Sequence, residues 1–447
     1  MLSKIGGPAF WGCTGFVYLA GFIAAGASPT EGTYLFTETP RYSPEAWLHN
    51  AERFPAGATI RISTPAGQRS LVTGFFSTAD PDLSSDATHV VFAGKQKNGD
   101  SWRIWEIALN QGTPRPVSGG DGDCIRPLYV PGDQIAYTRR TATGSQIEIA
   151  PLEGGKSERL TFTAGHFLTA DVLRDGRILF EAERTYAGRV AREIMSVYPD
   201  GTGVEAIRCD HGADRHSPRE MASGDIVFVQ GGRLARFTSS LAHETAFVPQ
   251  PAGEVTGPVA DSGRGELVFS SRANAEQPFR IAKLPARAHT PGMNEVEPVV
   301  VAPRIVPRRF PSALLAIRTA ANLLCLNVAT SRDAIRGGTI RTVRVYTQDD
   351  HGKPALLGTQ TVEKDGSFFV QVPGDKPLRL EALDGAGHVV SAEHNWWWMR
   401  VAEQRGCVGC HAGPERAPEN EVPEVLMRKD VPVPMLKPVV QQGNKGY

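Results

Sequence analysis

The chain has 447 residues, with 48 lysines and arginines against 48 aspartates and glutamates, so its formal net charge is zero. This length is enough for two or three domains with cores of their own, and the balanced charge argues against a nucleic-acid-binding protein, which needs a basic surface. Hydrophobic residues make up 41% of the chain, which indicates a globular protein, and its 47 glycines and 33 prolines favour a turn-rich, all-β fold over a helical bundle.

Residues 1–27 are predicted to be a signal peptide. Lys4 lies near the start, residues 16–25 form an apolar run, and Ala25-Gly26-Ala27 supplies the small residues of a cleavage site. The run is short for a membrane span, although an uncleaved N-terminal anchor is the alternative interpretation. We therefore expect a periplasmic or otherwise exported protein with no membrane span in the mature chain.

A short β-type triplet recurs five times along residues 87–300, with spacings of 45, 43, 48 and 41 residues. The triplets are Val90-Val91-Phe92, Ile135-Ala136-Tyr137, Ile178-Leu179-Phe180, Ile226-Val227-Phe228 and Leu267-Val268-Phe269. Such a period is typical of propeller blades, because one four-stranded blade cannot bury both of its faces alone. The pattern resembles secreted bacterial WD40-like propellers of the Tol-system type. Residues 28–86 are expected to close a sixth blade as a strand clasp, and an irregular series of β-sandwiches is the alternative.

Residues 285–313 are rich in proline and have no clear period, which indicates a linker between domains. The β-rich sequence that follows alternates apolar and polar residues between regular turn signals, which is the pattern of a small sandwich. The predicted fold class is therefore all-β. A five- to six-bladed propeller over 87–300 is followed by a small β-sandwich over 301–395 and a short C-terminal segment over 396–447.

Residues 407–411 read Cys-Val-Gly-Cys-His, a C-x-x-C-H motif. The thiols of Cys407 and Cys410 can form thioethers with the two vinyl groups of one haem, and His411 can then offer an imidazole nitrogen to the iron. A thioredoxin-like dithiol needs a βαβ context, and a zinc site needs a second pair of ligands nearby. These two sites and a structural disulfide are the alternatives. The sequence predicts one covalent haem c in the C-terminal segment.

The second axial ligand of the iron is left open by the sequence. Met427 and Met435 follow the motif, and His394 and Met399 precede it. Each has an ordinary interpretation as well, because methionines pack in cores and histidines lie in solvated turns. An open or water-bound position is a further alternative, and an open iron binds small ligands whereas a closed one only passes electrons.

Three consecutive tryptophans, Trp396, Trp397 and Trp398, lie shortly before the motif. On a strand, the first and third share one face and the second takes the other. They are expected either to pack at a domain interface or to cover the porphyrin. The charged residues nearest the motif, as candidate polar groups around the haem, are Glu403, Arg405, Glu415 and Arg416.

Motifs within residues 320–420 resemble the middle and haem-bearing region of hydrazine synthase alpha subunits. These motifs are Leu324-Cys325-Leu326-Asn327-Val328, Asp365-Gly366-Ser367-Phe368, Val372-Pro373, Lys376-Pro377-Leu378, Cys407-Val408-Gly409-Cys410-His411 and Arg416-Ala417-Pro418. Those subunits also carry an N-terminal propeller, so the resemblance extends to the order of domains. It implies haem attachment through Cys407 and Cys410 and a metal-binding His411. This chain has a single C-x-x-C-H where the alpha subunits carry a further haem-binding motif, so the reaction is not carried over.

The function predicted from the sequence is electron transfer by an exported c-type haem protein, with the propeller as a docking scaffold. A redox partner protein is then expected, and nucleic acid is not. The alternatives are a haem enzyme that acts on a small nitrogen or oxygen species and a propeller-based binding or sensory module. The oligomeric state is open.

Overall fold

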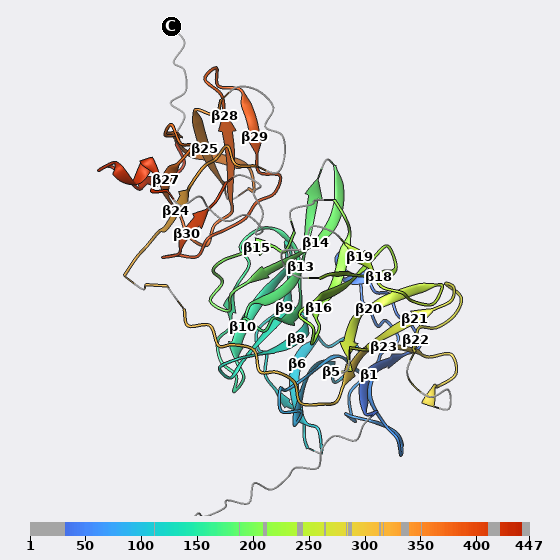
Figure 1. Cartoon of the computed structure of the whole chain (residues 1–447). Helices are drawn as coiled ribbons and strands as arrows, with labels where there is room; N and C mark the ends of the chain where they lie inside the picture. Colours follow the sequence, from blue (N-terminus) through green and yellow to red (C-terminus); the bar gives the residue numbers. More distant parts are fainter. Residues whose placement is uncertain are drawn as a thin grey trace, which may run out of the picture.

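The computed structural model describes residues 32–439 except 111, 187, 209–211, 239–244, 263–264, 283, 285–287, 313, 316, 332–338, 350 and 410–420. Within these residues the regular structure is almost entirely β-strand, with two four-residue 3-10 helices, η1 (Ala46–His49) and η3 (Glu424–Met427) (Figure 1). No helix in this part of the chain is long and apolar enough to cross a membrane. The predicted signal peptide lies outside the described residues. The all-β prediction is confirmed.

Five consecutive blades follow one another along the chain. The first blade consists of β4 (Ser77–Leu83), β5 (His89–Lys95), β6 (Arg103–Ala108) and β7 (Arg115–Pro116), and the second of β8 (Cys124–Val130), β9 (Gln134–Thr141), β10 (Gly144–Pro151) and β11 (Glu158–Arg159). The third consists of β12 (Gly165–Val172), β13 (Ile178–Tyr186), β14 (Arg189–Val197) and β15 (Glu205–Ala206), and the fourth of β16 (Arg215–Glu220), β17 (Ile226–Gln230), β18 (Arg233–Phe237) and β19 (Ala246–Phe247). The fifth consists of β20 (Glu254–Asp261), β21 (Leu267–Arg272) and β22 (Arg280–Ile281). The predicted triplets all lie in the second strand of a blade. Those strands are mostly buried because neighbouring blades cover both of their faces.

A sixth sheet combines the two ends of the propeller sequence. Its inner strand is β23 (Asn294–Val300), which pairs with β1 (Tyr34–Thr39), and β1 is followed outward by β2 (Thr59–Thr64) and β3 (Gly67–Ser70). The inner strands contact one another in the order β4, β8, β12, β16, β20, β23 and back to β4. The first domain is therefore a closed six-bladed propeller, in agreement with the predicted fold class.

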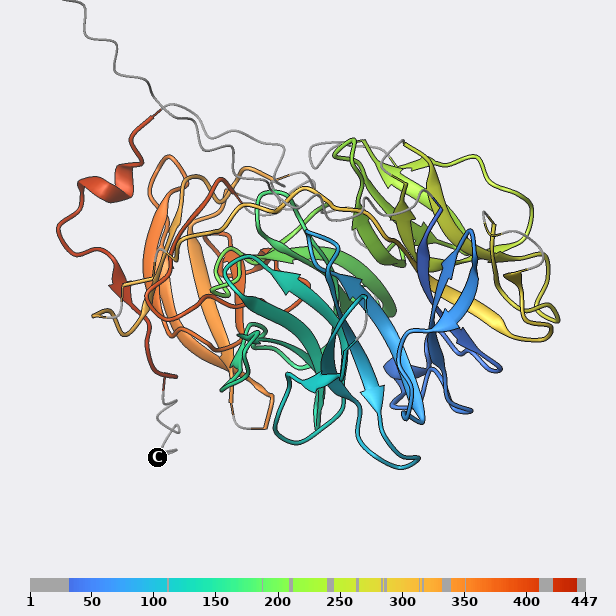
Figure 2. The same ribbon diagram turned by 90° about the horizontal axis from the view of Figure 1, so that it is seen from below.

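The second domain is a sandwich of two four-stranded sheets beside the propeller (Figures 1 and 2). One sheet has the order β30 (Gln404–Cys407), β24 (Ala321–Cys325), β27 (Phe368–Val372) and β31 (Val433–Pro434), and the other has the order β26 (Pro354–Thr361), β25 (Thr342–Gln348), β28 (Leu378–Leu383) and β29 (Val389–Ala392). Alternate residues of the central strands, such as Leu323, Val345 and Val370, are buried between the sheets. This is the period of two that the sequence showed.

The proline-rich linker runs across the propeller as extended chain before it enters the sandwich (Figure 2). Arg304 donates a hydrogen bond to Asp82 at 2.8 Å, and the ring of Phe310 stacks on Tyr198 with centroids 3.9 Å apart. Because both contacts join the linker to the propeller, they hold the linker on the propeller surface up to the start of the second domain.

The three tryptophans form the seam between the two domains. Trp398 is fully buried in a propeller cluster and meets Phe167 edge to face, with centroids 5.8 Å apart. Trp397 packs instead against the sandwich core, where its backbone pairs with Leu378. The carbonyl oxygen of Trp396 accepts a hydrogen bond from Arg184 of β13 at 3.1 Å. Interface packing, one of the two predicted roles, therefore holds for Trp398.

Candidate functional site

Cys407 is the last residue of β30, and it lies at the edge of the sandwich. The strand pairs in parallel with β24, and the register places Cys407 directly beside Cys325. Cys407 is half-buried and packs against the sandwich core, whereas Cys325 is fully enclosed in it. Cys410 and His411, the other two motif residues predicted to hold haem, lie outside the described residues.

A small pocket of about 50 Å³ lies between the two sheets beside Cys407. Its walls are mainly apolar, and they include Val328, Phe368, Leu380 and Trp397. An apolar pocket with a few polar groups is typical of a cofactor or small-molecule site. Cys407 thus borders a small, mainly apolar pocket at the edge of the sandwich.

Two further observations describe the surroundings of Cys407 and Gly409 in the motif. Desolvation raises the pKa of the Cys407 thiol to about 11, whereas a reactive redox cysteine needs a lowered pKa. The Cα of Gly409 approaches the Asn327–Thr330 turn so closely that a Cβ would lie 2.2 Å from the carbonyl oxygen of Thr330. The segment therefore passes tightly over the sandwich at the middle of the motif.

The candidate second ligands are spread over different environments. Met399 and Met435 are buried in the sandwich core, and Met427 is 80% exposed on η3. His394 meets Tyr186 of the propeller edge to face, with ring centroids 4.7 Å apart. Among the described residues, the lining of the pocket beside Cys407 contains neither a methionine nor a histidine.

Polar groups near the motif have roles that the sequence did not indicate. Glu403 is buried, accepts hydrogen bonds from Arg405 and from the backbone of Gly203, and so ties the sandwich to the propeller. Glu415 and Arg416 lie outside the described residues. The pocket is instead lined by Glu381 and Glu393, which no sequence motif marked because they come from a different sheet.

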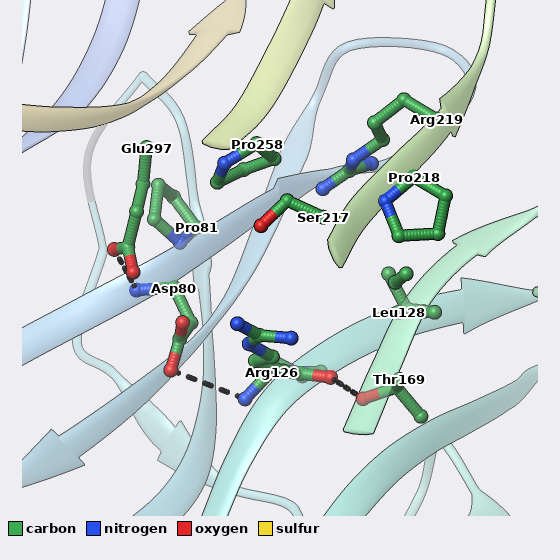
Figure 3. A pocket seen from close by; sticks show the side chains of 12 residues that line it. Asp80, Pro81, Arg126, Leu128, Thr169, Ser217, Pro218, Arg219, Pro258 and Glu297 are labelled. Atoms are coloured by element: carbon green, nitrogen blue, oxygen red, sulfur yellow. Dashed lines mark hydrogen bonds between the residues drawn. The ribbon is translucent and has the colours of Figure 1, made fainter. Parts of the chain in front are cut away.

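A second polar centre lies on the propeller axis (Figure 3). Arg53, carried there by the loop between β1 and β2, bonds Asp80 at 2.5 Å and Glu297 at 2.9 Å. Arg126 bonds Glu181 at 2.5 Å. The remaining cavity is about 30 Å³, which is room for about one water molecule. Through Arg53 these ion pairs bridge the inner strands β4 and β23, and the pair of Arg126 with Glu181 joins the inner strand β8 to the second strand of the next blade, β13.

The backbone explains why these carboxylates are placed on the axis. Asp80, Arg126, Ser217 and Glu297 each have a positive φ and precede a proline at a bulge of an inner strand. The bulge at Asp80 turns its N–H toward Glu297 at 2.9 Å, and that at Arg126 turns its N–H toward Asp80 at 3.1 Å. The N–H of Ser217 reaches Glu181 in the same way at 3.0 Å. A proline that recurs in the inner strands of several blades is the sequence signal for this polar centre, and the sequence analysis did not make use of it.

The axial carboxylates give the propeller a specific pH dependence. Burial, and then the charge of Asp80, raise the pKa of Glu297 from 4.5 to about 7. Between these values the folded state retains a proton that the unfolded state releases, so this contribution to stability is complete below about pH 4.5 and is lost as the pH rises to about 7. We expect the melting temperature of the wild type to fall relative to Glu297→Gln between about pH 5 and 7. If the melting temperatures of the wild type and Glu297→Gln changed with pH in the same way, the raised pKa of Glu297 would be contradicted.

Comparisons with known proteins agree with this architecture. Residues 327–412 match the family model of the hydrazine synthase alpha subunit middle domain. The solved structure of hydrazine synthase from Kuenenia stuttgartiensis is similar with a TM-score of 0.77 at 17% identity, over 90% of this chain and 72% of that chain. A search of curated proteins found no sequence match.

Structures of TolB show a more distant similarity. Putative TolB from Agrobacterium tumefaciens gives a TM-score of 0.38 at 19% identity, over 48% of this chain and 87% of that chain. TolB from Acinetobacter baumannii gives 0.43 at 15% identity, over 61% of this chain and 67% of that chain. The resemblance predicted from the sequence is confirmed by the family match and by the fold. Residues 327–412 are similar to the middle domain of hydrazine synthase alpha subunits, and 90% of the chain shares its fold with 72% of the hydrazine synthase chain.

Proposed function

We propose that the chain is an exported c-type haem protein that binds one haem covalently at the edge of the sandwich. Cys407 and Cys410 form the two thioethers, and His411 is the axial ligand of the iron. The observation that carries this proposal is the position of Cys407, which is half-buried at the end of the edge strand β30. The match of residues 327–412 to a hydrazine synthase domain supports the same assignment.

The haem supplies a one-electron redox centre, and electron transfer is the function that we assign to it. Apolar side chains beside Cys407, such as Trp397 and Phe368, would shield the nearest part of the haem from water, which would favour the less charged reduced state. The propeller is a rigid scaffold for docking of a redox partner, because its blades are locked at the axis by buried ion pairs. The segment around Glu403 joins that scaffold to the haem-bearing strand.

A second function, a haem enzyme that acts on a small nitrogen or oxygen species, is favoured by one observation. Met399 and Met435 are buried in the sandwich core, where neither lines the pocket beside Cys407. If no other side chain fills the second axial position, the iron is open to a small substrate. The similarity to hydrazine synthase gives the class of substrate for this candidate.

The test is covalent haem in protein made with the c-type maturation machinery. We expect one haem per chain that survives denaturation and acid extraction in the pyridine haemochrome assay. Cys407→Ser and Cys410→Ser should each lose one thioether, which shifts the haemochrome band, and the double variant should release its haem. Cys124→Ala, which alters a buried cysteine of the propeller, is the matched control and should keep the wild-type spectrum. Wild-type protein without haem would refute the proposal.

Carbon monoxide separates the two functions. Reduced protein with a closed, six-coordinate iron should show no spectral shift on addition of the gas, as expected for electron transfer. A clear shift would show an accessible iron, and the enzyme assignment would replace the electron-transfer one.

A further inference from the structure

Cys407 has a second cysteine beside it on the neighbouring strand. β30 and β24 pair in parallel, and their register places Cys407 directly opposite Cys325. Before this pair, the backbone N–H of Asn322 donates to the carbonyl oxygen of Glu403 at 2.9 Å. After it, the N–H of Leu326 donates to the carbonyl oxygen of Cys407 at 2.9 Å. The backbone ladder therefore fixes the register on both sides of the two cysteines.

The side chains of the two cysteines lie on the same face of the sheet. Residues in direct register on neighbouring strands point to the same side. On the opposite face, the directly paired Asn322 and Gln404 show how close such side chains are, because they are hydrogen-bonded at 2.9 Å. Cys325 is enclosed in the sandwich core, Cys407 packs against that core, and both line the small pocket between the sheets. The two thiols are therefore neighbours inside the sandwich.

The spacing of the strands fits a disulfide between these two residues. Neighbouring strands lie about 4.8 Å apart, and the Cα atoms of a disulfide lie about 4.4–6.8 Å apart. The bond therefore needs rotation of two side chains and no rearrangement of the strands. Cys325 and Cys407 are thiols in the structure. Among the other described residues, only Cys124 is a further cysteine, and it lies in the propeller core.

We propose that Cys325 and Cys407 form a disulfide in the chain before haem is attached, and that this bond withholds Cys407 from the haem. This inference rests on the proposed function, which places the chain in an oxidising compartment and gives Cys407 its thioether. The two thiols lose two electrons and two protons to another disulfide, which is thereby reduced to two thiols. Thioether formation adds a thiol S–H across a vinyl group, so reduction of the bond must precede attachment at Cys407.

The first experiment maps the bond in haem-free, full-length protein that has been treated with oxidised glutathione and then alkylated. Burial raises the pKa of the Cys407 thiol to about 11, so the oxidation is run in alkaline buffer, where more of the reactive thiolate is present. Trypsin releases Cys325 in residues 319–332 and both motif cysteines in residues 406–416. We expect these two peptides to be linked in the wild type and in Cys410→Ser, and the link to be lost in Cys407→Ser and in Cys325→Ala.

Three results of this mapping would overturn the inference. One is a disulfide confined to residues 406–416, which would join the two cysteines of the motif to each other. Another is a linked pair of peptides that persists in Cys407→Ser, because Cys410 would then be the partner of Cys325. The third is the absence of any link between the two peptides after oxidation.

The second experiment compares covalent haem in full-length wild type, Cys325→Ala and Cys124→Ala, all made with the c-type maturation machinery. We expect Cys325→Ala to carry more haem per chain than the wild type, and a thiol reductant in the medium to remove this difference. Cys124→Ala alters a buried cysteine of the propeller and should equal the wild type. Cys325→Val, which keeps an apolar strand-forming side chain in the core, is measured as well, so that a packing defect in one variant does not decide the result.

The outcomes separate this inference from the proposed function. Haem contents of Cys325→Ala and Cys325→Val that equal those of the wild type and Cys124→Ala would overturn the withholding of Cys407. Wild-type protein without covalent haem, with and without the reductant, would refute the proposed function itself. The peptide map decides the disulfide in either case, because it is made on protein without haem.

Discussion

Replacing Arg53 with alanine is expected to destabilise the propeller by about 3–5 kcal/mol, the cost of leaving buried charge without its partner. The Arg53 side chain is 4% exposed and bonds both Asp80 and Glu297. Burial raises the pKa of Asp80, but the charge and hydrogen bond of Arg53 outweigh this effect and hold that pKa below its usual value. Without the guanidinium, two neighbouring carboxylates remain on the axis, and each disfavours ionisation of the other.

The measurement is urea unfolding monitored by tryptophan fluorescence near pH 7. Arg236→Ala is the control, because that arginine is half-exposed and pairs only with Asp225 among the described residues. Such surface pairs contribute about 0–1 kcal/mol. Adding Glu297→Gln to Arg53→Ala should recover part of the lost stability by removing one of the two carboxylates. An unfolding midpoint equal to that of the wild type would show that the axial ion pairs do not hold the ring.

Replacing Trp398 with alanine is expected to cost about 3–5 kcal/mol, as for other fully buried large side chains. Trp398 is 0% exposed and fills a space bordered by Phe162 and Phe167 of the propeller, although it belongs to the chain of the second domain. The loss should therefore fall on the contact between the domains as well as on the propeller core. We expect the single thermal transition to separate into two.

Differential scanning calorimetry measures both effects. Trp396→Ala is the matched control, since this half-buried tryptophan has its ring beside Arg379 of the sandwich rather than in the propeller cluster. Its transition should stay single, with a much smaller change in melting temperature. A Trp398→Ala protein that keeps one transition near the wild-type temperature would show that the seam is held by other contacts, such as the hydrogen bond from Arg184 to Trp396.

The blades were predictable because their second strands are buried on both faces and so carry continuous apolar triplets at a regular period. The axial centre was not predictable, because its residues are single polar positions in one loop and five different strands. Arg53 comes from a loop, and Glu181 from the second strand of a blade. The sequence indicates the axial centre only through the prolines that follow Asp80, Arg126, Ser217 and Glu297.

The C-x-x-C-H motif consists of consecutive residues and can be recognised in the sequence alone. The residues around it are brought there by pairing between strands that are far apart in the sequence. Cys325 lies beside Cys407 because β24 and β30 pair in parallel, although 82 residues separate them in the sequence. Glu393 and Trp397 reach the same pocket from the segment that follows β28. The periodicity of a sequence does not indicate contacts between distant segments. The candidate polar groups predicted around the haem were therefore those nearest to the motif in the sequence, such as Glu403 and Arg405, and not the residues that line the pocket.

The shared sheet of β1 and β23 sets the order in which the protein can be completed. Thr37 and Glu297, which are hydrogen-bonded at 2.6 Å, are 260 residues apart. Five blades can assemble as the chain emerges, but β1 has no partner on its inner edge until residues 294–300 arrive. An unpaired edge is a template for intermolecular pairing, and contacts of such long range form slowly. A chain stalled before β23 is therefore the species most exposed to aggregation.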